Sequence, residues 1–184
     1  MLRDDARPDE PALAHGWTLI AADLVHPFEA APVQGVAAFV ASAPTDTTVQ
    51  DPEILALVGR ICGVLGLSMP TVLTFDGPGH ASAAGVIRIG GAALADGAPS
   101  DREALLAHCC GHLLLPHAGE LSADRVAALY QGSADAITRA IFAAAVHSGV
   151  TDPDPAVRVR EIQAWCATSG FARLVTSVAT AVRP

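Results

Sequence analysis

The sequence predicts an α+β domain that is mostly helical, with a small sheet beside one central helix. Apolar residues recur at helical spacing in several segments after residue 51. Two short β-branched runs, Thr71–Phe75 and Ala84–Ile89, lie on either side of the turn sequence Asp76-Gly77-Pro78-Gly79. The length of 184 residues fits one such domain better than two.

The two best-defined helices have clear starts and ends in the sequence. Asp51 followed by Pro52 is typical of a helix start, and Gly66 predicts the end of that helix. Ser100 with Glu103 three residues later forms a capping-box pattern, which predicts a helix from Ser100 to Leu115 before Pro116. Further helices are expected at residues 121–130, 134–147 and 156–167.

Residues 1–50 show no comparable pattern. They contain several prolines, and their first eleven residues carry many charges. We therefore expect residues 1–50 to be an N-terminal extension of unknown role and residues 51–184 to form the domain.

Charge and composition exclude several classes of function. The eleven basic residues are all arginine, and the formal net charge is −8. This balance favours neither nucleic acid nor an anionic membrane as a partner, and the absence of lysine excludes Schiff-base chemistry. The longest apolar runs, residues 33–43 and 136–146, are about half of the ~20 residues that a spanning helix needs. Four cysteines do not make a secreted disulfide framework, so we expect a cytoplasmic protein without membrane segments.

The helix after Ser100 contains the pattern that points most directly to chemistry. His108 and His112 are four residues apart, which puts both imidazoles on one helix face. Glu120 follows at the start of the next expected helix and would complete a set of two histidines and one carboxylate with an open position. Surface histidines or a helix-end hydrogen bond are the alternative, but unpaired imidazoles in this apolar run would be costly. We expect Zn2+, with Fe2+ as the alternative.

The same motif resembles that of the gluzincin metallopeptidases of the HtpX and CAAX-prenyl-protease type. His108-x-x-x-His112 is followed by Glu120-x-x-Ala123-Asp124-Arg125, as in that family. The short step from His112 to Glu120 also resembles the ImmA/IrrE peptidases, which are gluzincins too. Weaker similarities extend the resemblance over about residues 51–165 in the right order: Pro70–Phe75, Ala81–Gly85, His112–His117, Asp152-Pro153 and Arg158-Val159.

The resemblance implies a minimal gluzincin fold and a role for several side chains. His108, His112 and Glu120 would hold the metal, and Asp124 would orient a ligand histidine from behind. Arg158 would lie near the site as a catalytic candidate, paired with Glu120 or Asp124. His117 is a possible extra ligand. The strand Ala84–Ile89 would be the edge along which an extended substrate pairs.

Two departures from the family pattern make ordinary peptide hydrolysis unexpected. Cys109 replaces the glutamate that acts on the zinc-bound water, so the His-Glu-x-x-His motif is degenerate. Asp152 stands where relatives have a histidine that stabilises negative charge. Cys109 could be a metal ligand, a nucleophile or a core residue.

Three functions therefore stay open at this point. The first is a repurposed metal-dependent enzyme that acts on a small molecule or a peptide. The second is an inactive pseudoprotease that binds peptide or protein partners. The third is an active zinc metallopeptidase that uses Cys109.

Overall fold

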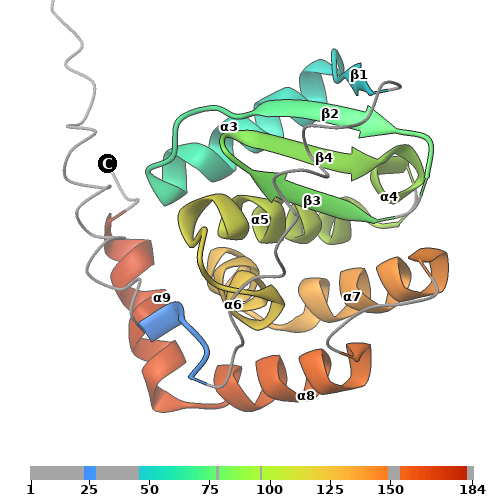
Figure 1. Ribbon diagram of the computed structural model, residues 1–184. Helices are drawn as coiled ribbons and strands as arrows, with labels where there is room; N and C mark the ends of the chain where they lie inside the picture. The colour runs from blue at the N-terminus through green and yellow to red at the C-terminus, as the bar shows by residue number, and fades with distance from the viewer. Residues whose placement is uncertain (1–22, 28–45, 78, 96, 149–153, 182–184) are drawn as a thin grey trace, which may run out of the picture.

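The computed structural model describes residues 23–27, 46–77, 79–95, 97–148 and 154–181. In this part of the chain a four-stranded sheet lies over a layered set of helices (Figure 1). The predicted α+β class, mostly helical with a small sheet, is confirmed. Among the described residues, no helix is long and apolar enough to cross a membrane.

The sheet is mixed, with strand order β1-β2-β4-β3. Its strands are β1 (Thr47–Thr48), β2 (Thr71–Phe75), β3 (His80–Ala83) and β4 (Val86–Gly90). The pair β2 and β4 is parallel, and the other two pairs are antiparallel.

A tight hairpin makes β3, rather than β4, the strand at the sheet edge. Ala84 and Gly85 both have positive φ, 51° and 77°, as the two-residue turn of such a hairpin requires. The sequence prediction of a single edge strand at Ala84–Ile89 was wrong, because β4 lies inside the sheet between β2 and β3. The residues His80-Ala81-Ser82-Ala83 have weak strand propensity, and their pairing with β4 makes them a strand.

The helices follow the expected order, with one correction at a helix start. They are α3 (Pro52–Leu65), α4 (Gly91–Ala95), α5 (Pro99–Leu114), α6 (Glu120–Gln131), α7 (Asp135–Ser148), α8 (Pro155–Cys166) and α9 (Ser169–Ala181). The predicted capping box at Ser100 was wrong: α5 begins at Pro99, after Ala98, without a side-chain cap. Proline at this position has the right φ for a first turn and lacks the N–H that a cap would satisfy.

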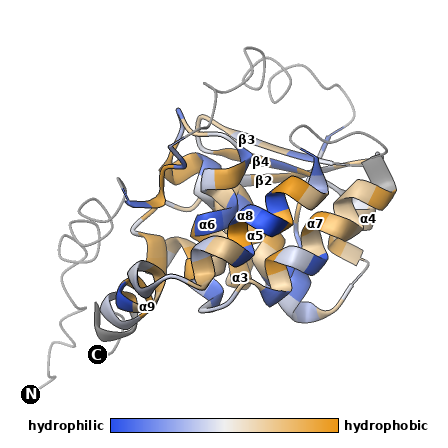
Figure 2. Cartoon of the chain, turned by 90° about the horizontal axis from the view of Figure 1, so that it is seen from below, coloured by the Kyte–Doolittle hydropathy of each residue, from blue (hydrophilic) through white to orange (hydrophobic). Residues whose placement is uncertain are grey.

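Helix α5 is the centre of the domain. It lies beneath the sheet, and α6, α7 and α8 lie on its other side (Figure 1). Its residues from Ala104 to Gly111 are all buried. Seen from below, hydrophilic segments stand out on α6 and α8 among the apolar segments around α5 (Figure 2).

Gly111 allows α5 and α6 to approach closely. A Cβ at this position would lie 3.0 Å from the Cα of Ala123, and 3.1 Å from its carbonyl oxygen. Any larger residue would therefore have to push the backbone of α6 away. This close crossing brings the C-terminal half of α5 next to the first turn of α6.

Parts of residues 1–50 pack against the domain. Strand β1 pairs with β2, and the carboxylate of Asp46 accepts hydrogen bonds from Arg88 at 2.8 Å. Leu24 is fully buried, and the N–H of His26 donates to Ser122 Oγ on α6 at 2.9 Å. These residues of the expected N-terminal extension therefore contribute to the same core.

Candidate metal centre

Two adjoining helix segments bring together the three side chains expected to hold a metal. His108 and His112 lie one turn apart on α5, and their Nε2 atoms are 3.2 Å apart. Glu120 is the first residue of α6. Its Oε2 atom lies 3.3 Å from His108 Nε2, and its Oε1 atom lies 3.3 Å from His112 Nε2.

These distances fit the ligand shell of a small tetrahedral ion. Zinc binds histidine nitrogen and carboxylate oxygen at about 2.0–2.2 Å, so two ligand atoms of a regular tetrahedron lie about 3.3–3.6 Å apart. The two imidazole nitrogens are 3.2 Å apart, and each lies 3.3 Å from a different oxygen of the Glu120 carboxylate. The two histidine nitrogens therefore have nearly the spacing of two ligands of one zinc-sized ion, and the Glu120 carboxylate lies beside both of them.

A fourth donor, His80, comes from the first residue of β3. The ligand atoms of His80, His108, His112 and Glu120 all lie within 4.8 Å of one another. The His80 ring stands edge-on to the His108 ring, with 4.8 Å between centroids. We call these four side chains the donor cluster.

His80 is a residue of the site that sequence reasoning missed, because it directly follows the turn sequence Asp76-Gly77-Pro78-Gly79 and lies before the predicted strand Ala84–Ile89. The two-residue turn Ala84-Gly85 lacks the Asn-Gly or Asp-Gly sequence that usually signals such a hairpin, so the sequence did not reveal β3. In a strand, His80 and Ser82 are two residues apart and share one face. That face lies against α5, where His80 contacts His108 and Ser82 contacts Cys109.

Asp124 and Arg158 form a buried ion pair next to the donor cluster. Asp124 is fully buried, and its Oδ1 atom lies 2.9 Å from His108 Nδ1. The two atoms are close, but their geometry departs from a good N–H···O hydrogen bond, so the contact is mainly electrostatic. It still leaves the other nitrogen of His108 facing the cluster, as in metal sites where a carboxylate orients a histidine.

Arg158 on α8 joins the two carboxylates of the site. Its guanidinium donates to both oxygens of Asp124 at 2.9 and 2.7 Å and lies 3.0 Å from Glu120 Oε2. Its side chain is only 5% exposed. The expected pairing of Arg158 with Glu120 or Asp124 is thus present with both partners.

These contacts set the charge state of the metal-free site. Burial opposes ionisation of Glu120, but its contacts with His108, His112 and Arg158 hold its pKa well below the usual range. Burial likewise opposes a charge on Asp124, and Arg158 overcomes it and lowers the pKa of Asp124. Burial disfavours the charged form of His108, yet contacts with Asp124 and Glu120 raise its pKa to about 9. Burial and the neighbouring His108 lower the pKa of His80 to about 3, so its imidazole is neutral.

The other sequence candidates lie outside the donor cluster. Cys109 is fully buried, with its thiol against Ser82 under β3. Burial raises the pKa of Cys109 to about 12, so the thiol stays protonated at neutral pH. His117 is exposed and is not one of the four clustered donors. Asp152 lies outside the described residues.

We expect thiol reagents to leave Cys109 unmodified in the native protein. Burial raises the pKa of Cys166 to about 11 and that of Cys109 to about 12, so both thiols are mostly protonated at pH 8, but Cys166 is partly exposed and Cys109 is buried. An aromatic disulfide reagent at pH 8 should therefore modify Cys166 first, and Cys109 only after unfolding, as peptide mass spectrometry would show. Cys166→Ser should remove the early reaction and Cys109→Ser should leave it unchanged. Rapid native-state labelling of Cys109 would contradict this assignment and favour a reactive thiol.

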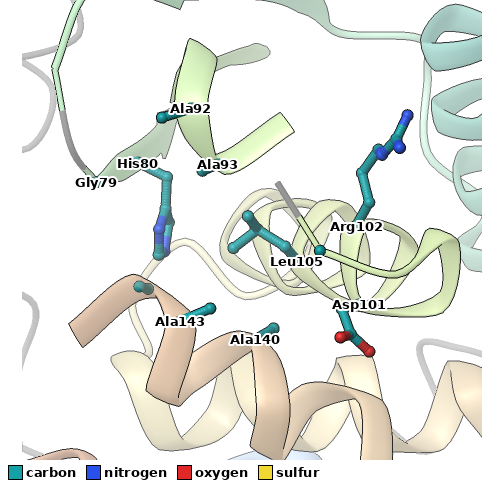
Figure 3. Close-up of a pocket in the computed structure, with 11 residues that line it drawn as sticks. Gly79, His80, Ala92, Ala93, Asp101, Arg102, Leu105, Ala140 and Ala143 are labelled. Atoms are coloured by element: carbon teal, nitrogen blue, oxygen red, sulfur yellow. The ribbon is translucent and has the colours of Figure 1, made fainter. Parts of the chain in front are cut away.

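A small cavity also reaches His80. Gly79, Ala92, Ala93 and Leu105 form part of its wall, and Ala140 and Ala143 of α7 close it from below (Figure 3). Asp101 and Arg102 also line it. His80 is thus shared between the donor cluster and the wall of a mostly apolar cavity.

Comparisons with protein-family models, with curated proteins and with solved structures gave no match for this chain.

Proposed function

We propose that this protein binds a divalent transition metal through His108, His112 and Glu120. The observation that carries this proposal is the convergence of the three side chains: the two imidazole nitrogens are 3.2 Å apart, and each lies 3.3 Å from one of the two oxygens of Glu120. Imidazole nitrogen with one carboxylate suits Zn2+, and Fe2+ is the alternative. When bound, such an ion supplies Lewis acidity toward a substrate oxygen.

The surrounding residues hold these donors in place. Asp124 stands behind His108, and Arg158 keeps both Asp124 and Glu120 ionised and oriented. Two histidines on one helix, a glutamate opening the next helix and an aspartate one turn later are also the order seen in gluzincins. This order supports gluzincin ancestry for the metal-binding domain.

We propose further that the protein does not cleave peptides by the usual gluzincin mechanism. That mechanism needs a carboxylate beside the metal as general base, and position 109 offers a buried, protonated thiol. Losing a general base costs about 10²–10⁴-fold in rate. The site keeps the three candidate ligands and the supporting residues Asp124 and Arg158 but lacks the general base at position 109. This combination fits a repurposed metal-dependent enzyme that acts on a small molecule or a peptide.

Metal titration of ligand variants tests the binding site. We expect Zn2+ to bind the chelator-treated protein in a 1:1 ratio by isothermal titration calorimetry. His108→Ala, His112→Ala and Glu120→Gln should each weaken binding by more than the 10–100-fold typical of losing an outer-shell partner. His117→Ala is the matched control and should bind as the wild type does. Unchanged affinity in the three ligand variants would overturn the proposed site, and metal analysis of the purified protein decides between zinc and iron.

Substitutions at position 109 test the proposed loss of peptidase function. We expect the wild type and Cys109→Ala to leave an unstructured protein substrate such as casein intact. Cleavage gained in Cys109→Glu would support descent from a peptidase that lost its base. Cleavage by the wild type that disappears in Cys109→Ala would instead show that Cys109 is the catalytic group of an active peptidase.

A further inference from the structure

His80 is the donor that the metal-binding motif does not explain. It lies outside the α5–α6 unit, at the start of edge strand β3, yet its ligand atom lies within 4.8 Å of those of His108, His112 and Glu120. Three protein donors leave one position of a tetrahedral ion open. His80 is the side chain of the donor cluster that is left to fill it.

We propose that His80 is the fourth protein ligand of the metal and that the resting site is therefore closed, so that an outside ligand binds only by displacing His80. This inference rests on the proposed metal-binding function. It distinguishes a closed site from the open three-ligand site that the sequence motif implies.

The backbone around His80 holds it toward α5. The turn before β3 packs tightly on the end of β4, where a Cβ on Gly90 would lie 2.1 Å from the carbonyl oxygen of Gly77. The N–H of Gly90 donates to Gly79 O at 2.9 Å, and His80 pairs with Ile89 across the hairpin. These contacts fix the first residue of β3 and therefore the backbone position of His80.

The four donors come from three separate elements, and their types suit one metal ion. β3 supplies His80, α5 supplies the two motif histidines, and α6 supplies Glu120. Three neutral imidazoles and one carboxylate give a ligand set that zinc or iron(II) accepts. A metal bound in this way connects the sheet edge to the two helices.

The cavity beside His80 offers a place for the displaced ring. His80 lines it together with small side chains, among them Ala92, Ala93 and Ala143 (Figure 3). Rotation of the His80 side chain into this space opens the fourth position while the β3–β4 pairing stays intact. A ligand with a metal-binding group, such as an azide ion or a hydroxamate, then takes the position that His80 left.

Cobalt-loaded protein provides the test. Co2+ takes zinc-like sites, and its visible absorption is strong in four-coordinate and weaker in five-coordinate geometry. We expect the wild type to show the strong four-coordinate spectrum and to bind azide at least about tenfold more weakly than His80→Ala does. In His80→Ala a water molecule should take the fourth position, so its bands should differ in position from those of the wild type and should change as azide is added. His117→Ala is the matched histidine control and should behave as the wild type.

The outcomes separate this inference from the function on which it rests. Identical spectra and equal azide affinity in the wild type and His80→Ala, both with Co2+ bound, would overturn the role of His80 alone. Failure of the wild type to bind Co2+ would overturn the proposed metal function and this inference with it. If His80→Ala does not fold by circular dichroism, His80→Gln replaces it, and ready azide binding to the wild type would still overturn a closed site.

Discussion

Replacing Arg158 with methionine should lower the free energy of unfolding by about 3–5 kcal/mol, because it removes the guanidinium that pairs with the fully buried Asp124 and with Glu120. Asp124 is fully buried, and Arg158 contacts both of its oxygens as well as Glu120. Methionine fills a similar volume without a charge, so the variant removes the ion pairs more than the packing. Urea denaturation of the metal-free protein, with the slope checked for two-state behaviour, measures the effect.

Arg160 on the same helix is the matched control for Arg158. Its side chain is 69% exposed and pairs with its neighbour Glu161. Arg160→Met should therefore change stability by less than about 1 kcal/mol. Adding Asp124→Asn to the Arg158→Met variant should cost less than Asp124→Asn alone, because the ion pair between Arg158 and Asp124 is already lost. Equal effects of Arg158→Met and Arg160→Met would show that the buried network does not support the site.

Zinc should raise the stability of the folded protein by about 2.7 kcal/mol when free metal is 100 times the dissociation constant. The unfolded chain has no preassembled donor set, so metal-binding free energy adds to folding free energy. Thermal unfolding with buffered Zn2+, and again after a chelator, measures this gain. His112→Ala should reduce the gain sharply, whereas His117→Ala should keep it. A gain that persists in His112→Ala would contradict binding at the donor cluster.

The gain in folding stability from zinc should increase as the pH rises, because zinc and a proton compete for the His108 imidazole. In the metal-free protein the pKa of His108 is raised to about 9 from an ordinary value near 6.5. The protonated His108 therefore stabilises the metal-free fold fully below pH 6.5, and this contribution is lost as the pH rises through about 9. Zinc needs the neutral imidazole, so its stabilisation strengthens over the same interval. The difference between the unfolding midpoints with and without zinc should increase from pH 6 to pH 7 and pH 8. A difference that stays the same at all three pH values would contradict this linkage.

The clustering of His108, His112 and Glu120 could be predicted because its geometry is local. His108 and His112 share a helix face wherever that segment is helical, and the periodicity of apolar residues made the helix predictable. The position of Glu120 at the start of the next helix followed from the same reasoning. The capping prediction at Ser100 was wrong because a competing local signal, Pro99, sets the helix start one residue earlier.

The role of His80 could not be predicted, since it depends on a strand without strong strand propensity. β3 consists of histidine, serine and alanine, and only its pairing with β4 keeps it extended. The burial of Cys109 under Ser82 depends on the same strand. The sequence left this thiol as ligand, nucleophile or core residue, and the structure places it in the core beneath β3.

The sequence by itself determined the class of the fold and the spacing of His108, His112 and Glu120, because helix geometry fixes which residues share a face. Only the tertiary structure decided that His80 joins these donors and that Arg158 pairs with both Asp124 and Glu120 rather than with one of them. Those contacts join residues far apart in the chain, and they depend on how β3 and α8 pack on α5 and α6. Packing of that kind follows from the shape of the whole core, which no local pattern of residues specifies.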